Sequence, residues 1–432
     1  MTDTANRAYG NSEKIAASLA ARHRSEKWFR GIGFAAIVAA LGFLAFMILS
    51  IGSTGYKAFQ QTYVQLEINF DADVIDPEGT RDPAVLSRAN YQGLVRKALR
   101  DMFPDVKSRR DRRSLNDTVS SVGQFELMDM VLADPSLIGT TRTVWLTASD
   151  DFDMAMKGSI PLDVPQDERR ISDKQISWLD KLNSEGRLES RFNSRFFTSG
   201  DSREPEQAGI LAALVGTGFS LLVCFAFAFP VGVLSAVYLE MFAPRNRISD
   251  IIEININNLA AVPSIVFGLL GLAMLLGVFG MPRSSPLVGG MVLALMTLPT
   301  IIVAARASLK AVPPSLRDAA LGLGASEMQA VFHHVVPSAL PGMLTGAIIG
   351  MAQALGETAP LLMIGMVAFI VDIPGSVLEP ATALPVQIFL WADSTERGFA
   401  EKTAAAILVL LGFLVVMNLV AIILRKKFEQ RW

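Results

Sequence analysis

Residues 315–337 read SLRDAALGLGASEMQAVFHHVVP and form a polar insert between two apolar stretches, each long enough to cross a membrane. Two prolines end the helix before the insert. Ser315 is followed three residues later by Asp318, a spacing close to that of a capping box. The insert is therefore predicted to begin with a short helix, from about residue 316 to 323.

The rest of the insert predicts a second short helix after a tight turn. Gly324 stands where a left-handed helix C-cap favours a residue without a side chain. Ser326 and Gln329 then form a second capping box, and Pro337 is expected to end the helix that follows. The insert is thus predicted to be two short helices, joined at a glycine and held at the membrane surface.

This helical pair allows more than one interpretation. It could be an ordinary loop between two membrane helices, or a helix-turn-helix that binds nucleic acid. The second helix contains no Lys or Arg with which to contact phosphates or guanine, so nucleic-acid binding is excluded. The small residues Ala319, Ala320 and Gly324 instead suit a helix that fits closely into a groove on a partner protein.

The spacing within the insert resembles that of the EAA loop of ABC-importer permeases. The residues that match this motif are Asp318, Ala319, Ala320, Gly324, Val336 and Pro337. Asp318 stands in place of the usual Glu, and His334 in place of a common aliphatic residue. Two further motifs, VPSIVFG at 262–268 and GETAPLL at 356–362, resemble the phosphate branch of the same family. The resemblance runs from about Gly209 to the end of the sequence.

This resemblance implies an all-α polytopic membrane protein with the type I ABC-importer permease fold, which would import inorganic phosphate by alternating access. It also implies that the insert docks in a groove of a separate ATPase. The residues expected to take part in this coupling are Ser315, Leu316, Arg317, Asp318, Ala319, Ala320, Gly324 and Pro337. The implied partners are a second permease similar to PstC, a dimeric ATPase similar to PstB and an extracytoplasmic phosphate-binding protein.

Composition and hydropathy favour a membrane protein with a separate charged domain. The 432-residue chain is 51% hydrophobic with a mean hydropathy of +0.38, and its charged residues are unevenly distributed. Six apolar stretches are expected to be transmembrane helices in contact with lipid: 31–56, 209–238, 257–280, 287–305, 340–370 and 403–424. A cleaved signal peptide is the alternative for the first stretch, but its apolar part exceeds the usual length, which favours a retained anchor.

Basic residues near the ends of these stretches predict their orientation, since Lys and Arg resist translocation. Four of them lie between residues 22 and 30, before the first stretch, and a run of three follows the last. Both ends and the coupling loop 313–337 are therefore expected on the cytoplasmic side of a bacterial inner membrane. The predicted parts are a cytoplasmic segment (1–30), a first transmembrane helix (31–56), a periplasmic domain (57–206) and a permease core with five transmembrane helices (207–432).

Residues 57–206 are predicted to form a small inserted α+β domain, whose role stays open. Apolar and polar residues alternate over 64–70, as in a half-buried strand, whereas 91–102 and 171–192 have the apolar spacing of helices. The basic run 107–113 would suit nucleic acid, but the predicted orientation places it on the wrong side of the membrane. An exposed loop, or a contact with a binding protein, is expected there instead.

Several kinds of chemistry are not expected of this chain. The sequence contains no GxxxxGK[ST] loop, so ATP and Mg²⁺ are expected on the partner ATPase, with no cofactor on this chain and no enzymatic activity of its own. Adjacent His333 and His334 point in different directions on a helix and predict no metal site. Cys224 is the single cysteine and has no partner for a disulfide. No internal repeat is evident, so a second permease half is expected from another chain.

Four residues are candidates for the substrate path or for charge pairing: Arg306, Gln353, Glu357 and Thr358. Glu357 lies in the predicted fifth span, where an ionisable group is usually functional, although it could satisfy backbone groups at a helix break. Its carboxylate would repel an anion, so it is expected to hold a cation, from Arg306 or from the partner permease. Arg306 could instead reach the cytoplasmic lipid headgroups. Gln353 stands where the resembled family often has arginine, which favours a partner that supplies more of the positive charge.

Phosphate as the substrate follows from the resemblance alone, and two other functions stay open. Importers of sulfate or molybdate share the architecture and would be favoured if the binding protein bound a fully deprotonated oxyanion. A membrane-bound sensor would use residues 57–206 to detect a ligand, but a sensor needs one or two spans rather than six. Accumulation of ligand that depends on ATP would distinguish the transporter from the sensor.

Overall fold

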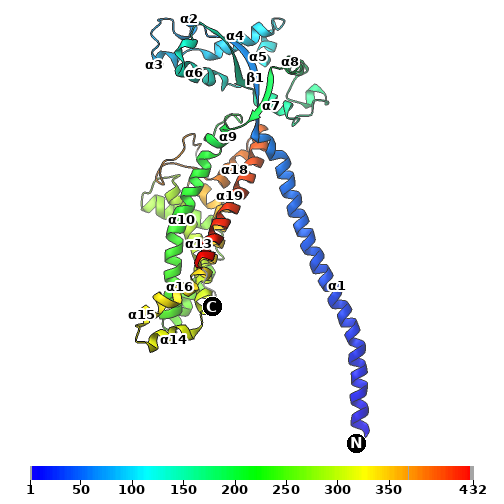
Figure 1. Cartoon of the computed structure of the whole chain (residues 1–432), viewed down its shortest axis with the longest axis vertical. Coiled ribbons are helices and arrows are strands. Elements are labelled where there is room, and N and C mark those ends of the chain that lie inside the picture. Colours follow the sequence, from blue (N-terminus) through cyan, green and yellow to red (C-terminus); the bar gives the residue numbers. More distant parts are fainter. Residues whose placement is uncertain (1, 368, 429–432) are drawn as a thin grey trace. The chain divides into compact units, whose positions relative to one another are not determined.

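The computed structural model describes residues 2–367 and 369–428 (Figure 1). They fall into two units, one ending at Thr54 and the other beginning at Gly55. The first unit is formed by helix α1 (Thr2–Gly55), whose apolar part is a candidate membrane span. Within the second unit we distinguish a sheet domain, residues 60–198, from a helical core, residues 199–428.

Five helices in the described residues are long and apolar enough to cross a membrane. They are α1, α10 (Leu211–Val237), α13 (Pro286–Lys310), the continuous helix of α15 and α16 (Glu327–Gly356) and α19 (Gly398–Phe428). A sixth crossing is reached if α11 (Arg247–Leu259) and α12 (Ser264–Leu270) are counted as one broken span. The predicted number of six is therefore matched only when this bent pair is included.

The third predicted span, 257–280, is not one straight helix. Helix α11 ends at Leu259, and α12 begins after Pro263 and continues as a π-helical segment to Val278. The two halves are bent by 105°. Proline disfavours the helical conformation in the residue before it, which explains why the helix breaks at this point.

The fifth predicted span, 340–370, also has different limits in the structure. The helix begins earlier, inside the insert, and ends at Gly356. Glu357 is extended, with φ −81° and ψ 126°, and Pro360 lies in the first turn of the short helix α17 (Ala359–Met363). The prediction of one helix through Glu357 is therefore wrong, because the backbone leaves the helix at that residue.

Helices α10, α13 and α16 form the centre of the helical core (Figure 1). Small residues allow the helices to approach closely: a Cβ added to Gly346 of α16 would overlap the Ala304 side chain of α13. Cys224 of α10 is buried, and its sulfur lies 3.6 Å from the Thr297 hydroxyl of α13. After α17, helix α18 (Leu384–Ala392) packs against α19 and α10.

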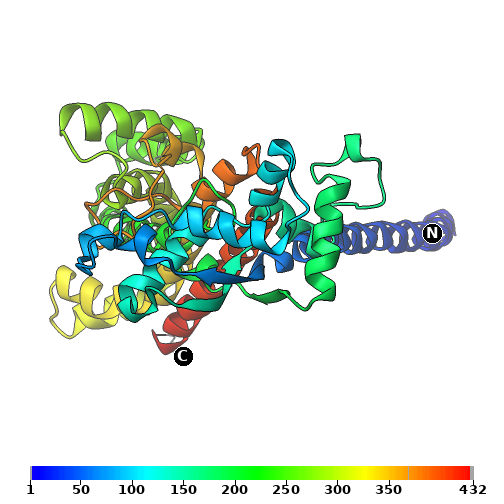
Figure 2. The ribbon, with the colours of Figure 1, turned by 90° about the horizontal axis from the view of Figure 1, so that it is seen from above.

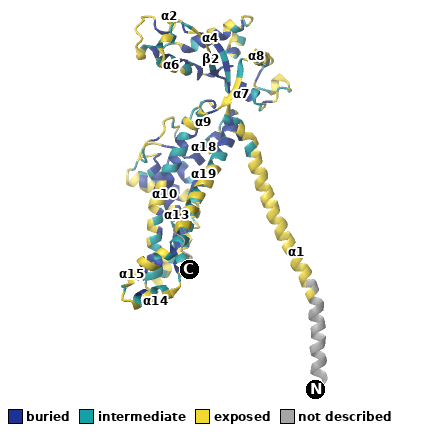
Figure 3. Ribbon diagram, viewed as in Figure 1, coloured by how far each residue is buried: buried dark blue, intermediate teal, exposed yellow. Residues whose placement is uncertain are grey.

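The sheet domain is built on three antiparallel strands in the order β2-β1-β3. The strands are β1 (Gln60–Asn69), β2 (Thr141–Thr147) and β3 (Leu188–Phe192). The apolar residues predicted to alternate over 64–70 are fully buried in the domain core, and they are Val64, Leu66 and Ile68 of β1 and Phe70 just after it. Figure 3 shows buried parts of the ribbon in this sheet in dark blue. The predicted strand is confirmed, and its buried face is where the helices of the domain pack.

The helices of the sheet domain are mostly short. They are α2 (Ala72–Ile75), α3 (Pro83–Leu86), α4 (Tyr91–Met102), α5 (Arg109–Asn116), α6 (Gly123–Ala133), α7 (Asp150–Met156), α8 (Asp173–Ser184) and α9 (Arg195–Thr198). Single 3₁₀ turns lie at Tyr56–Phe59, Pro135–Leu137 and Gln166–Glu168. Helix α4, as predicted over 91–102, packs along β1 (Figure 2).

Two predictions about this domain are corrected by the structure. The segment 171–192 is helical only over α8, because Gly186 turns the chain with φ +69° and the residues after it form β3. The basic run 107–113 is not a loop, since most of it belongs to α5, where Leu115 is buried and most of the arginines stay exposed. A helix with one buried residue and a charged outer face satisfies the backbone better than an open loop.

Candidate functional site

The first helix of the insert, α14 (Pro314–Gly322), starts about two residues earlier than predicted. Pro313 occupies the N-cap position and Pro314 the first helical position, so Ser315 lies inside the helix and caps nothing. The predicted Ser315–Asp318 capping box is therefore wrong. Proline suits the first helical position because its missing N–H would be unpaired there in any case.

The turn after α14 has the geometry predicted for Gly324, whose φ is +88°. Two hydrogen bonds close the helix end: Ala325 N–H donates to Ala320 O at 3.1 Å, and Gly324 N–H donates to Leu321 O at 2.9 Å. This pair of bonds defines a Schellman motif, which requires a left-handed residue at the position of Gly324. The glycine turn of the insert is thus confirmed.

The second helix of the insert begins as predicted but does not end at Pro337. Ser326 Oγ accepts the N–H of Gln329 at 3.3 Å, and Gln329 Oε1 accepts the N–H of Ser326 at 2.9 Å, which confirms the capping box. After α15 (Glu327–Ala330), a π-helical turn at Val331–Val335 leads directly into α16 (Val336–Gly356). The wider π turn accommodates the proline ring, so the insert is continuous with a membrane helix.

The residues predicted for coupling do not all lie on the surface. Ser315, Asp318 and Ala319 are exposed, Arg317 pairs with Glu327 at 3.2 Å, and Ala320 is buried inside the insert. The most exposed apolar side chain is one that the sequence reasoning missed: Leu323 is 92% exposed at the tip, and Met328 is 59% exposed beside it. A hollow of about 570 Å³, lined by residues such as Pro313 and Ser338, opens next to α14.

Arg306 does not pair with Glu357, and that part of the prediction is wrong. Its Nε lies 3.3 Å from Glu240 Oε2, and its Nη2 lies 2.9 Å from Glu253 Oε2. Lys310 adds a second cation 3.5 Å from Glu240. These side chains join α13 to α11 and to the π-helical turn Tyr238–Phe242 after α10. With two carboxylates already on its guanidinium, Arg306 has little positive charge to offer an anion.

The other three path candidates lie around the end of α16. Gln353 is exposed, and Glu357 and Thr358 are half-buried. Within residues 2–367 and 369–428 no cation pairs with Glu357, and its carboxylate takes part in no hydrogen bond. The helix break considered for Glu357 is present, but the side chain does not cap it. Gln353 is therefore accessible beside the helix break at Glu357.

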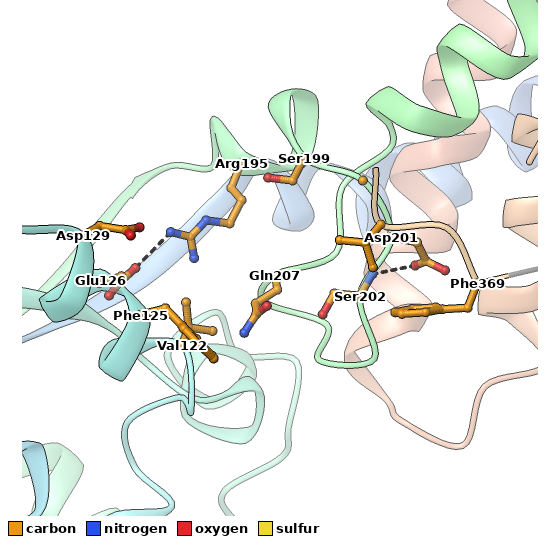
Figure 4. Close-up of a pocket in the computed structure, with 12 residues that line it drawn as sticks. Val122, Phe125, Glu126, Asp129, Arg195, Ser199, Asp201, Ser202, Gln207 and Phe369 are labelled. Atoms are coloured by element: carbon orange, nitrogen blue, oxygen red, sulfur yellow. Dashed lines mark hydrogen bonds and ion pairs between the residues drawn. The ribbon is translucent and has the colours of Figure 1, made fainter. Parts of the chain in front are cut away.

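A second hollow, of about 300 Å³, lies between the sheet domain and the helical core (Figure 4). Three carboxylates line it, from Glu126, Asp129 and Asp201, against one guanidinium from Arg195. Arg195 is paired with Glu126 at 3.2 Å, and Asp201 Oδ1 accepts hydrogen bonds from Ser202 N–H and Trp391 Nε1–H, both at 2.9 Å. The remaining negative charge repels oxyanions, so this hollow does not suit a phosphate group.

Carboxylates also gather where α7 meets the helical core. Burial, together with the nearby negative charges of Glu206, Asp151 and Asp153, raises the pKa of Asp150 to about 7. Burial likewise raises the pKa of Glu206. The backbone N–H of Gly398 donates to Asp150 Oδ2 at 3.2 Å and opposes the shift.

The free energy of unfolding is expected to fall as the pH rises from about 4 to about 7. The folded protein keeps the proton of Asp150 over a range in which the unfolded chain loses it. The stabilisation is complete below the unfolded pKa and is lost as the pH passes the folded value. A shift of this size corresponds to about 4 kcal/mol. Thermal unfolding in detergent between about pH 4 and 8 measures it, and Asp150→Asn should flatten the profile.

Asp134→Asn is the matched control for this pH profile. Hydrogen bonds from the hydroxyl and the N–H of Ser136 lower the pKa of Asp134, so it does not titrate over the same range. Its replacement should leave the slope of the profile unchanged. An Asp150→Asn profile as steep as that of the wild type would show that Asp150 is not the group responsible.

Comparison with known proteins assigns two parts of the chain. Residues 228–432 match the family described as "Binding-protein-dependent transport system inner membrane component", and residues 16–166 match "Domain of unknown function (DUF3333)". The phosphate transport system permease protein PstA 1 of Mycobacterium tuberculosis is 31% identical over 224 residues, which are 51% of this chain and 72% of that protein.

Two further relatives extend the comparison. The probable ABC transporter permease protein YqgI of Bacillus subtilis is 29% identical over 229 residues, covering 50% of this chain and 76% of that protein. The phosphate transport system permease protein PstC of Haemophilus influenzae is 30% identical over 244 residues, covering 51% of this chain and 76% of that protein. All three alignments include about half of the present chain.

Proposed function

Since this chain belongs to the family of binding-protein-dependent transport system inner membrane components and is a PstA-like permease, we propose that it carries inorganic phosphate into the cell. It is a multi-pass membrane subunit of an ABC importer. The observation that supports phosphate most directly is the 31% identity with a phosphate permease. The insert and the GETAPLL motif both lie within residues 228–432, the part of the chain that matches the family. Two identical or related permease chains would enclose the path, and a PstC-like chain is the partner that fits.

The proposed orientation places residues 1–30 and the basic end of α19 in the cytoplasm. Basic residues from Arg22 to Arg30, and the run Arg425–Lys427, support it by the positive-inside rule. The insert 313–337 then faces the cytoplasm, and residues 57–206, which contain the sheet domain, face the periplasm. A phosphate-binding protein would deliver the substrate on that side.

The insert is proposed to couple the permease to a separate ATPase, which carries ATP and Mg²⁺. Exposed Leu323 and Met328 supply an apolar tip of the kind that binds in a protein groove. Gly324 orients this tip relative to α14. Because α15 continues into α16, a displacement of the tip would be carried along a single helix into the membrane.

The substrate path is proposed to pass the end of α16. Gln353, Glu357 and Thr358 lie on a surface that a second permease could cover. Glu357 would repel an oxyanion, so a cation from the partner permease is required to hold it in place. Arg306 supports the path from a distance, through the ion pairs that fix α11 to α13.

Uptake of radiolabelled phosphate tests the proposed substrate. Cells that lack this chain should recover uptake when the wild-type chain is supplied, and an excess of sulfate or molybdate should not compete. If sulfate or molybdate abolishes the recovered uptake, the substrate is the competing oxyanion and not phosphate. Binding of phosphate without accumulation, and without dependence on ATP, would show that the chain is a sensor and not a transporter.

A further inference from the structure

The first turn of α19 is held by side chains of the sheet domain. Asp150 accepts the N–H of Gly398 at 3.2 Å, at the start of the helix. Ser159 Oγ donates a hydrogen bond to Glu401, and Lys157 Nζ lies 3.8 Å from Glu401 Oε2. We call these five residues, Asp150, Lys157, Ser159, Gly398 and Glu401, the junction clamp. The sequence separation across it is about half the chain, so no local motif could have revealed it.

The charges of the clamp are buried and paired. The side chains of Lys157 and Glu401 are 6% and 8% exposed. Lys157 also forms an ion pair with Asp153, and Asp153 accepts the N–H of Thr62 in β1 at 2.7 Å. The clamp is therefore tied to the central strand of the sheet. Removing one partner of such a pair leaves a buried charge without compensation, which makes the contact hard to open.

The backbone of α19 leaves room for the clamp only because residue 398 is glycine. A Cβ added to Gly398 would overlap the carboxylate of Asp150. Gly412, almost four turns further along the same helix, has no atom within 4 Å of an added Cβ. The close approach at Gly398 is thus specific to the clamp and is not a general property of glycines in α19.

The chain enters and leaves the sheet domain against the same helix. A Cβ added to Gly55, just before the domain, would lie 2.8 Å from the backbone of Ala404. At the end of the domain, the ring of Phe196 packs with Trp391, which packs in turn with Phe399 of α19. Both connections are packed rather than free, so they do not act as flexible linkers.

From α19 the contacts continue to the insert. Helix α19 packs on α16, and Arg425 Nη1 donates to Thr345 Oγ1 at 3.4 Å. Helix α16 is continuous with α15. A chain of packed elements therefore joins the sheet domain to the proposed coupling insert, which is the physical requirement for passing a displacement between them.

We propose that the sheet domain and α19 move as one rigid body during transport, with the junction clamp as the positioning element that joins them. The inference rests on the proposed function, since transport supplies the motion. A displacement of the sheet domain would then displace the last membrane helix, α19, with it. A protein that docks on the sheet domain would act on α19 directly.

A disulfide across the clamp tests whether the two parts move together. The Cβ built at Gly398 lies 2.5 Å from Asp150 Cγ, so the two Cβ atoms are within about 4 Å, which suits a disulfide. In Asp150→Cys/Gly398→Cys we expect the bond to form in the full assembled transporter, and uptake to be the same before and after reduction. Arrested uptake that a reductant restores would overturn the proposal, as would failure of the disulfide to form.

The complementary test opens the clamp. Gly398→Val should displace Asp150 and lower uptake about tenfold at an unchanged membrane level, whereas Gly412→Val should not. In the purified assembly, Gly398→Val should keep basal ATP hydrolysis and lose its stimulation by the binding protein. General misfolding would instead lower both the basal and the stimulated hydrolysis. Equal stimulation in both variants would overturn the proposal.

Failure of the proposed substrate is distinguishable from failure of the clamp. If wild-type cells take up no phosphate, phosphate is not the substrate. Disulfide formation and ATP hydrolysis still test the role of the junction clamp in that case. If Gly398→Val is absent from the membrane, the cysteine pair decides it alone.

Discussion

Gly324→Val is expected to reduce phosphate uptake to less than about a tenth of the wild-type rate, with the protein still present in the membrane. The φ of +88° costs a residue with a side chain roughly 1–2 kcal/mol, and a β-branched residue more. The two hydrogen bonds of the Schellman motif would open, and the exposed tip at Leu323 would lose its direction. No atom lies within 4 Å of an added Cβ, so the effect acts through the backbone and spares the membrane helices.

Two substitutions separate the backbone effect from contact with a partner. Gly324→Asn should keep most of the uptake, because asparagine tolerates the left-handed conformation. Gly322→Ala, inside α14 and with nothing within 4 Å, should be neutral. Uptake by Gly324→Val at the wild-type rate would refute the role of the turn. An equal loss in Gly324→Val and Gly324→Asn would assign the effect to a crowded surface instead.

The turn could be predicted from the sequence because its chemistry is local. A glycine at the helix end and the pair Ser326–Gln329 each act within one helical turn, and both appear in the structure as predicted. The start at Ser315 was ambiguous, because two prolines and a serine all favour helix initiation and the prolines decide the position. The passage of the helix through Pro337 depends on a π-helical turn, for which the sequence carries no clear signal.

Composition predicted where the apolar stretches lie but not where they break. Pro230 and Pro299 sit inside α10 and α13 without ending them, whereas Pro263 and Pro360 mark interruptions. The difference depends on whether neighbouring helices and side chains satisfy the freed backbone groups. That information lies in the tertiary packing and is not available from a single stretch of sequence.

Long-range ion pairs were the least predictable part of the candidate site. Arg306 was one of two predicted sources of a cation for Glu357, and the structure pairs it with residues 66 and 53 positions earlier in the sequence. Glu253 carried a weak signal, since it is an acidic residue within an otherwise isoleucine-rich segment. The choice among several carboxylates requires knowing which helices are neighbours, and α11, which carries Glu253, packs against α13.

Arg306→Gln is expected to destabilise the helical core by about 2–3 kcal/mol and to lower both the membrane level and uptake. The carboxylates of Glu240 and Glu253 would face each other with only Lys310 nearby, 3.5 Å from Glu240. Quantitative immunoblotting and thermal unfolding in detergent measure the loss. Lys174→Gln, which removes an exposed pair with Asp111, is the control and should change stability by less than about 1 kcal/mol.

The triple variant Arg306→Gln/Glu240→Gln/Glu253→Gln decides what Arg306 does. If the arginine acts by neutralising the two carboxylates, replacing all three by neutral residues of similar shape removes the unpaired charge and should restore stability and most of the uptake. If Arg306 contacts the substrate, the triple variant should be stable in the membrane and still unable to transport. The pairing distances favour the first outcome, because an anion would have to displace two carboxylates from a guanidinium that is only 14% exposed. Under the proposed function, direct recognition of the oxyanion then requires cations outside this network, which the proposed partner permease would supply.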